Sequence, residues 1–171
     1  MHFELGQNWE FAVPETTDEV FIQTGPKGGQ LLFTSPHHVF DPSNLSEPKE
    51  LPAPDSATEW VSWLQRHPNL ETSKPLPVSV GGASGKLIDV RASSMPKNYP
   101  RKVCYDEPCV PLYPISAGST IGSYEGWKDR FIIVDVEGET VLIDVAALSE
   151  RFDTFSPKAQ EILDSVEWKG G

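Results

Sequence analysis

The two cysteines are the residues of this sequence whose spacing most directly limits their chemistry. Cys104 and Cys109 are compatible with a local disulfide, with half of a zinc site or with a redox pair. Zinc requires two further ligands at suitable spacing, and none is obvious. A redox pair is normally Cys-x-x-Cys at the start of a helix, which Pro108 and Pro111 oppose. We therefore favour a disulfide, which indicates an oxidising compartment.

Three aspartates lie within aliphatic triplets, at positions Asp89, Asp135 and Asp144. Carboxylates gathered on one face of a sheet can bind a cation or share a proton. In a hairpin formed by the strands that carry them, Asp135 and Asp144 lie four positions apart, which is about 13 Å at about 3.3 Å per residue. We therefore expect these acids to occupy a solvated sheet face or to accept hydrogen bonds from loop N–H groups.

Known motifs for nucleophilic catalysis and phosphate binding are absent from the sequence. Serine catalysis needs a histidine and an orienting acid, and no Gly-x-Ser-x-Gly turn is present. The glycine-rich residues 25–29 lack the Lys-Ser/Thr end of a phosphate-binding loop. On an extended backbone His37 and His38 point to opposite sides, and no third ligand stands nearby. We predict no catalytic residue, no metal and no cofactor.

Two strands joined by a tight turn organise the predicted fold. Residues 131–136 and 140–145 are rich in Val and Ile, and Gly138 between them supplies the positive φ of a two-residue turn. With this turn, Phe131 faces Asp144 across the hairpin. One face of the hairpin is then wholly aliphatic and must lie against a core, whereas the mixed second face is expected to be partly covered.

Two segments have the apolar spacing and the capping residues of helices. In residues 55–67, Ser56 begins a capping box, and apolar side chains then recur every three or four residues. In residues 156–166, Ser156 is the predicted N-cap and Pro157 the first helical residue, where its missing N–H costs nothing. We expect these two helices to pack on the faces of a sheet.

Short strands and proline-rich loops make up the rest of the predicted fold. The further strands are expected as a β-meander at residues 9–13, 20–23 and 30–34, and as a hairpin around a glycine turn at 76–80 and 84–91. Residues 41–54 and 93–114 are predicted to be irregular proline-rich loops. The fold class is therefore α+β, with a twisted antiparallel sheet of about six to eight strands and two main helices, in one globular domain of residues 1–171.

The net charge of −11 limits the partners that this chain can bind. A nucleic-acid partner requires basic patches that displace counterions from phosphates, and none is present. Binding to anionic membranes is disfavoured for the same reason. We interpret the charge mainly as a contribution to solubility, with an acidic face for a basic partner as the alternative.

The first residues of the sequence and its cysteine pair favour different locations for this protein. No apolar run approaches the length of about 18 residues that crosses a bilayer, so no membrane insertion is expected. The first residues lack the basic and apolar segments of a signal peptide, which leaves a cytoplasmic protein or the mature or excised part of an exported one. The cysteine pair favours the extracytoplasmic or cell-envelope alternative.

Several short motifs occur in the same order as in a known group of proteins that this sequence resembles. They are residues 60–70, 77–82, 88–90, 104, 108–110, 134–138 and 163–166. In this order they resemble small exported proteins of actinobacterial cell envelopes, whose domain is similar to the PsbP-like fold shared with the Ran-binding nuclear import factors. The resemblance implies an antiparallel sheet with helices on its faces and a non-catalytic binding or accessory role. It implies no catalytic residues.

We accordingly expect a non-enzymatic binding or accessory module of unknown ligand. The expected ligand site lies between the 93–114 loop and the sheet, because long loops in compact domains are often functional and this one carries aromatic residues. The residues expected to bind there are Tyr99, Tyr105, Tyr113 and Trp127. Two alternatives remain, an acidic inhibitor or immunity-type protein that masks a basic partner, and a hydrolase whose site is not recognised.

Overall fold

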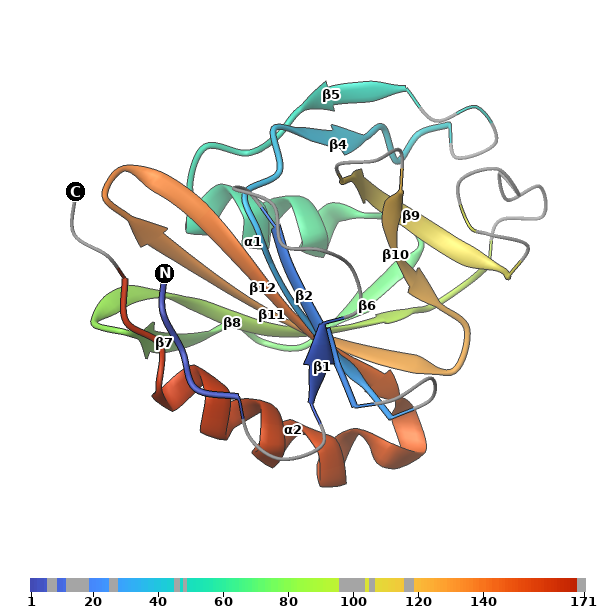
Figure 1. The fold of residues 1–171 in the computed structure, drawn as a ribbon. Coiled ribbons are helices and arrows are strands. Elements are labelled where there is room, and N and C mark those ends of the chain that lie inside the picture. Colours follow the sequence, from blue (N-terminus) through green and yellow to red (C-terminus); the bar gives the residue numbers. More distant parts are fainter. Residues whose placement is uncertain are drawn as a thin grey trace.

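The structure, a computed structural model, is built around a hairpin of β11 (Trp127–Val136) and β12 (Glu139–Leu148). Phe131 faces Asp144 across this hairpin, so the predicted register is confirmed. The turn residue Gly138 has a φ of 92°, a conformation that glycine adopts without steric cost. This hairpin lies in the middle of the main sheet (Figure 1).

The main sheet has eight antiparallel strands, in the order β1-β2-β3-β12-β11-β8-β6, with β7 also paired to β8. Its other strands are β1 (Glu10–Phe11), β2 (Glu19–Gln23), β3 (Gln30–Thr34), β6 (Leu70–Thr72), β7 (Leu76–Val80) and β8 (Ala83–Ala92). The predicted meander and the predicted β7–β8 hairpin are both confirmed. The structure describes the chain except residues 6–8, 12–18, 25–27, 45–46, 48, 96–103, 105–106, 116–118 and 169–171.

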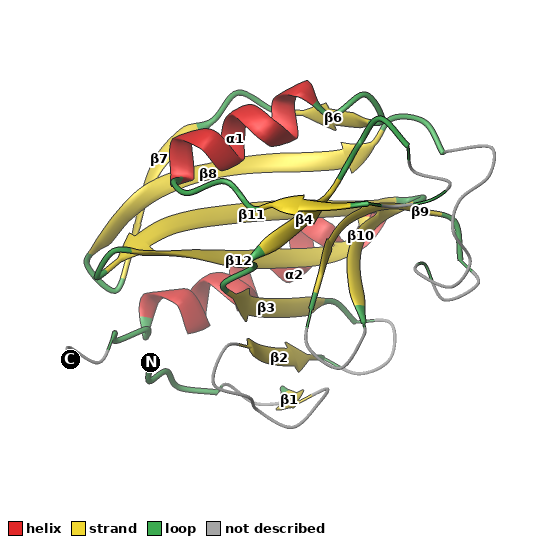
Figure 2. Ribbon diagram, turned by 90° about the horizontal axis from the view of Figure 1, so that it is seen from above, coloured by secondary structure: helices red, strands yellow, loops and turns green. Residues whose placement is uncertain are grey.

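Apolar cores lie on both faces of the sheet, as the two faces of the hairpin predict. Helix α2 (Ser149–Asp164) covers one face, and α1 (Ala57–Arg66) lies on the other together with two small sheets (Figures 1 and 2). The core under α2 includes Ile22, Phe33, Ile132, Val134, Ile143, Val145, Phe152, Phe155 and Ile162. The core under α1 includes Leu32, Trp60, Leu64, Ile88, Val90, Leu112, Tyr113, Phe131, Ile133 and Leu142. The α+β class with two helices is therefore confirmed.

Helix α1 forms where its capping residues and apolar spacing predict. The Ser56 side chain accepts a hydrogen bond from the Glu59 backbone N–H at 3.3 Å, which satisfies one of the unpaired donors of the first turn. The Glu59 carboxylate accepts from the Asp55 N–H at 2.9 Å, one residue before the usual partner in a capping box. The predicted apolar stripe is buried and consists of Ala57, Trp60, Val61 and Leu64.

Helix α2 begins at Ser149, eight residues before the predicted first helical residue, Pro157. Ser156 is therefore not an N-cap, and Pro157 lies inside the helix. The prediction was wrong because the apolar stripe extends further toward the N-terminus. Phe152 and Phe155 are both buried against the sheet, and their burial outweighs the hydrogen bond that Pro157 cannot donate.

Two small sheets lie on the α1 side and include parts of both predicted loops. One pairs β4 (His38–Phe40) with β5 (Glu50–Pro52), and the other pairs β9 (Cys109–Pro114) with β10 (Thr120–Tyr124). Strand β9 differs from the irregular structure predicted up to residue 114. Its proline at position 111 is tolerated because the partner strand shifts register there, between Ile121 and Gly122.

The outer edge of β8 is shared by β7 and β6, with a short gap between them. Ser73 fills this gap: its backbone N–H donates to the Asp89 carbonyl at 2.9 Å, and its hydroxyl accepts from the Asp89 N–H at 3.0 Å. Beyond β8, strand β7 carries Pro77, which has no backbone N–H to offer a further strand.

Replacing Pro157 by alanine should raise the free energy of unfolding by about 1 kcal/mol, because alanine restores an N–H donor inside α2. The gain is partly offset by the greater freedom of the unfolded chain. Urea denaturation measures the change, with Lys158→Ala as the control at the neighbouring exposed position. A stability of Pro157→Ala equal to or below that of the parent protein would contradict the prediction.

Candidate functional site

A cleft of about 430 Å³ lies at the turn of the β11–β12 hairpin, where several elements end. Its volume is within the range of about 300–1,000 Å³ that is usual for small-molecule sites. Segments from both ends of the chain reach it, because His2 and Glu167 form an antiparallel bridge. The cleft is lined by Met1, Glu19, Val20, Phe33, Thr34, Ser35, His37, Val136, Glu137, Glu139, Val141 and Trp168.

The lining of this hairpin cleft combines an apolar part with an acidic part. The apolar part continues the core under α2, to which Phe33, Val136 and Trp168 belong or against which they pack. The acidic part is supplied by the glutamates at positions 19, 137 and 139. A surface of this kind suits a ligand with an apolar body and a positive charge.

A second cleft of about 270 Å³ adjoins the first and shares Ser35, His37 and Glu139 with it. Asp55, just before α1, adds a further carboxylate to this second cleft. Among the described residues that line the two clefts, none is Lys or Arg. Carboxylates are therefore the main source of charge among the described residues that line both clefts.

The turn residue Glu137 has a φ of 52°, which is unusual for a residue with a side chain. The left-handed conformation costs an L-residue about 1–2 kcal/mol, and Asn or Gly fits this turn position better. Glu137 instead adds a carboxylate to the hairpin cleft. Backbone strain of this kind is concentrated at functional sites in proteins.

A second group of ionisable residues is buried in the core under α1. Asp129 on β11 and Asp144 on β12 are 3% and 1% exposed. Asp144 faces Phe131 and Asp129 faces Ala146, so the two carboxylates are diagonal neighbours on one face of the hairpin. The expectation that Asp144 occupies a solvated face is therefore wrong.

Burial controls the ionisation of both carboxyl groups. Desolvation raises the pKa of Asp129 to about 7, although a hydrogen bond from the Ser123 hydroxyl at 2.6 Å acts in the opposite direction. Desolvation and the nearby charge of Asp129 raise the pKa of Asp144 well above its ordinary value. The pair thus retains at least one proton near neutral pH.

Tyr113 on β9 belongs to the same buried group. Its side chain is 1% exposed and packs edge-on against Trp60, with 5.9 Å between ring centroids. Desolvation and the charges of Asp144, Asp129 and Glu19 raise the pKa of the phenol well above 10. Within the described residues, neither the Tyr113 hydroxyl nor Asp144 Oδ1 has a hydrogen-bond partner. Buried polar atoms without partners are rare and call for a physical explanation.

A third charged group lies on the α2 side of the sheet. Asp89 accepts from Arg130 Nε at 2.7 Å and pairs with Lys128 Nζ at 2.9 Å, and both cations lie over the Phe152 ring. Burial opposes ionisation of Asp89, but the hydrogen bonds from Arg130 and Lys128 outweigh it and lower the pKa. This arrangement fixes the start of α2 on the sheet, because one carboxylate and the Phe152 ring hold both cations.

The structure separates the aromatic residues expected to bind a ligand. Tyr113 is enclosed in the core, whereas Trp127 is half-buried at the start of β11, with its ring 6.4 Å from that of Tyr124. Tyr99 and Tyr105 lie outside the described residues. An aromatic site between the 93–114 segment and the sheet therefore remains a proposal.

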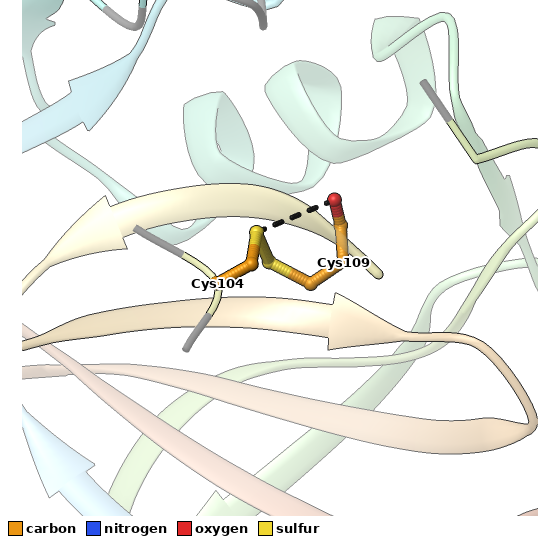
Figure 3. Close-up of a disulfide and its surroundings, with 2 residues drawn as sticks. All are labelled: Cys104 and Cys109. Atoms are coloured by element: carbon orange, nitrogen blue, oxygen red, sulfur yellow. Dashed lines mark hydrogen bonds between the residues drawn. A yellow bond between two sulfur atoms is a disulfide. The ribbon is translucent and has the colours of Figure 1, made fainter. Parts of the chain in front are cut away.

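The predicted disulfide between Cys104 and Cys109 is confirmed (Figure 3). Both cysteines are fully buried, and Cys109 is the first residue of β9. The bond thus ties the segment before β9 to the small sheet that covers the buried carboxylates. The disulfide closes a short loop, so by chain entropy it raises the free energy of unfolding by about 2–3 kcal/mol at most.

The three histidines at positions 37, 38 and 67 lie in different surroundings. His37 is exposed and lines both clefts, whereas His38 lies 3.8 Å from Glu50 on the neighbouring strand. His67 is buried at the end of α1, and desolvation lowers its pKa to about 4. Across the described residues, no three His, Cys, Asp or Glu side chains are placed to hold a metal ion.

Two comparisons with known proteins find no match, since neither a family model nor a curated protein matches the chain. Among solved structures, the chain is similar to LpqN, which is involved in cell envelope biogenesis of Mycobacterium tuberculosis. The identity is 11% and the TM-score 0.36, over 95% of this chain and 79% of LpqN. A likeness this weak carries no argument about function, and the PsbP-like resemblance remains a prediction. In the described residues, no helix has the length and apolar character needed to cross a membrane.

Replacing Tyr113 by phenylalanine should leave the free energy of unfolding unchanged or raise it by up to about 1 kcal/mol, because the lost hydroxyl has no partner. Ser123→Ala is the matched comparison, since it removes a buried hydroxyl that donates to Asp129. It should lower stability by about 1.5–3 kcal/mol. Urea denaturation measures both changes, and a loss above about 1 kcal/mol for Tyr113→Phe would refute the assignment of an unpartnered hydroxyl.

Proposed function

We propose that this chain is a non-enzymatic binding module whose hairpin cleft accepts a ligand with an apolar body and a cationic group. The observation that carries the proposal is the lining of the cleft, in which aliphatic and aromatic side chains stand beside three glutamates and no described lining residue is Lys or Arg. Electrostatic complementarity of this kind selects positively charged ligands. The strained φ of Glu137 supports the same site.

The chemistry of the cleft favours binding over catalysis. A hydrolase of the serine type requires a nucleophile held by a base. Among the described cleft residues, Ser35 and His37 are present but no hydrogen bond joins their side chains. The carboxyl groups with raised pKa, Asp129 and Asp144, lie in the core under α1 and do not line the cleft. A hydrolytic role is therefore the less favoured alternative.

An extracytoplasmic or cell-envelope location and a PsbP-like relationship are part of the same proposal. The buried disulfide supports the location, because disulfides persist in oxidising compartments. The sheet with helices on both faces is compatible with the PsbP-like resemblance. The net charge of −11 further supports a cationic ligand over a nucleic acid or an anionic lipid.

Octylammonium and octanoate, two probes of similar size and opposite charge, test the proposed ligand class. Titration calorimetry should detect binding of octylammonium and none of octanoate, because the acidic part of the cleft attracts one and repels the other. Glu139→Gln should weaken octylammonium binding by about two- to fivefold, as expected for loss of one exposed charge. Glu161→Gln on the exposed face of α2 is the control and should leave the affinity unchanged. Equal binding of both probes would exclude a charge-selective cleft.

The acidic-inhibitor alternative differs in the size of its ligand. The net charge of −11 favours it to the extent that a basic protein, rather than a small amine, occupies the acidic surface. Such an interface should lose affinity steeply between about 50 mM and 500 mM salt, whereas the apolar part of the cleft retains octylammonium in that range. Retention of the amine at high salt therefore supports the small-ligand proposal.

The proposed location is tested by the thiol content of the protein purified from its native source without reductant. Alkylation followed by mass spectrometry should find no free thiol, because Cys104 and Cys109 are joined. Recovery of two free thiols would contradict an oxidising compartment. Reduction before alkylation is the control and should expose both cysteines.

A further inference from the structure

We propose that Asp129 and Asp144 form a proton-binding switch that holds the β9–β10 hairpin against the main sheet while the pair carries a proton and releases it when both are ionised. This inference concerns the core under α1 and does not rest on the proposed ligand cleft, although Glu19 borders both. It assigns a role to two buried polar atoms that otherwise have no partner, Asp144 Oδ1 and the Tyr113 hydroxyl.

The β9–β10 hairpin contacts the acid pair through one residue from each of its strands. Ser123 of β10 donates its hydroxyl proton to Asp129 Oδ2 at 2.6 Å, and Ser123 is fully buried. Tyr113 of β9 places its phenol within the field of Asp144, which acts on it more strongly than Asp129 or Glu19. The small sheet therefore covers the carboxylates and excludes water from them.

Several described elements pack around the acid pair and Tyr113. Strand β2 contributes Glu19, which is 9% exposed and acts on the Tyr113 phenol. Strand β9 contributes Tyr113 and β10 contributes Ser123. Helix α1, β3 and β8 contribute apolar side chains to this core, among them Trp60, Leu32 and Val90. Among these described residues no cation faces the pair, so a proton is the positive charge available to neutralise it.

The direction of the pH dependence follows from the raised pKa of each group. The closed hairpin is fully favoured below pH about 4, where an aspartic acid is protonated whether it is buried or solvated. The free energy that favours the closed over the open hairpin falls as the pH rises through about 7, the pKa of Asp129 in the closed form. Burial and the charge of Asp129 also raise the pKa of Asp144, so its ionisation adds to the loss. In this range, opening of the hairpin releases protons.

Amide hydrogen exchange of the intact protein between pH 5 and pH 9 tests the switch. Protection factors of amides in β9 and β10 should fall about tenfold per pH unit for each proton released on opening. Amides in β2 and β3 should keep their protection factors, because these strands pair within the main sheet. Acrylamide should quench the tryptophan fluorescence of the protein more strongly over the same range, because opening exposes Trp60, which contacts Tyr113.

Two variants and a control separate the switch from a general loss of stability. Asp144→Asn should flatten the pH dependence of protection in β9 and β10, and Asp129→Asn with Asp144→Asn should abolish it. Asp135→Asn, an exposed position on the same strand as Asp129, should behave like the parent protein. Protection factors that do not change with pH in the parent protein would overturn the proposal. It would equally be overturned by a parallel loss in β2 and β3, or by an unchanged slope in Asp144→Asn.

Discussion

Pairing of β11 with β12 is the constraint on which the rest of the structure depends. Its single register assigns alternate side chains to two separate cores, so that Ile132 and Ile143 face α2 while Phe131 and Asp144 face α1. A shift of one residue would exchange both sets at once. The same register places Asp129 diagonally from Asp144 and brings the turn with Gly138 to the cleft. The register of this hairpin therefore determines the two cores, the buried acid pair and the position of the cleft.

The features that the sequence predicts correctly are those that depend on interactions between residues close together in the chain. The hairpin register, the cap at Ser56 and the disulfide between Cys104 and Cys109 each depend on residues close together in sequence. The start of α2 does not, because Phe155 packs against the chain at Gly29, where a side chain would collide with its ring. Phe152 and Phe155 continue the apolar stripe of α2, but Ser156 and Pro157 also fit the pattern of a helix start.

The two acid sites could not be read from the sequence, for different reasons. Asp129 precedes the apolar run that predicts the strand at residues 131–136, so the residue that meets Asp144 lies outside the predicted hairpin, whereas Asp135 lies inside it. The hairpin cleft gathers residues from both ends of the chain, two strands of the meander and one turn. Such a site depends on strand order, which no short motif specifies. Alternation predicts that the second face is mixed, but the raised pKa of Asp144 results from its burial and from the nearby Asp129, which alternation does not show.

The outer strand at the β8 edge has a consequence for how these molecules behave toward one another. An exposed strand edge offers unpaired N–H and C=O groups on which a second chain can build, the first step in ordered aggregation. Here the gap in the edge is closed by Ser73, and Pro77 removes a donor from the strand beyond it. At the opposite edge, the described part of β1 is two residues long. These features shorten the open strand edge on which a second chain could pair.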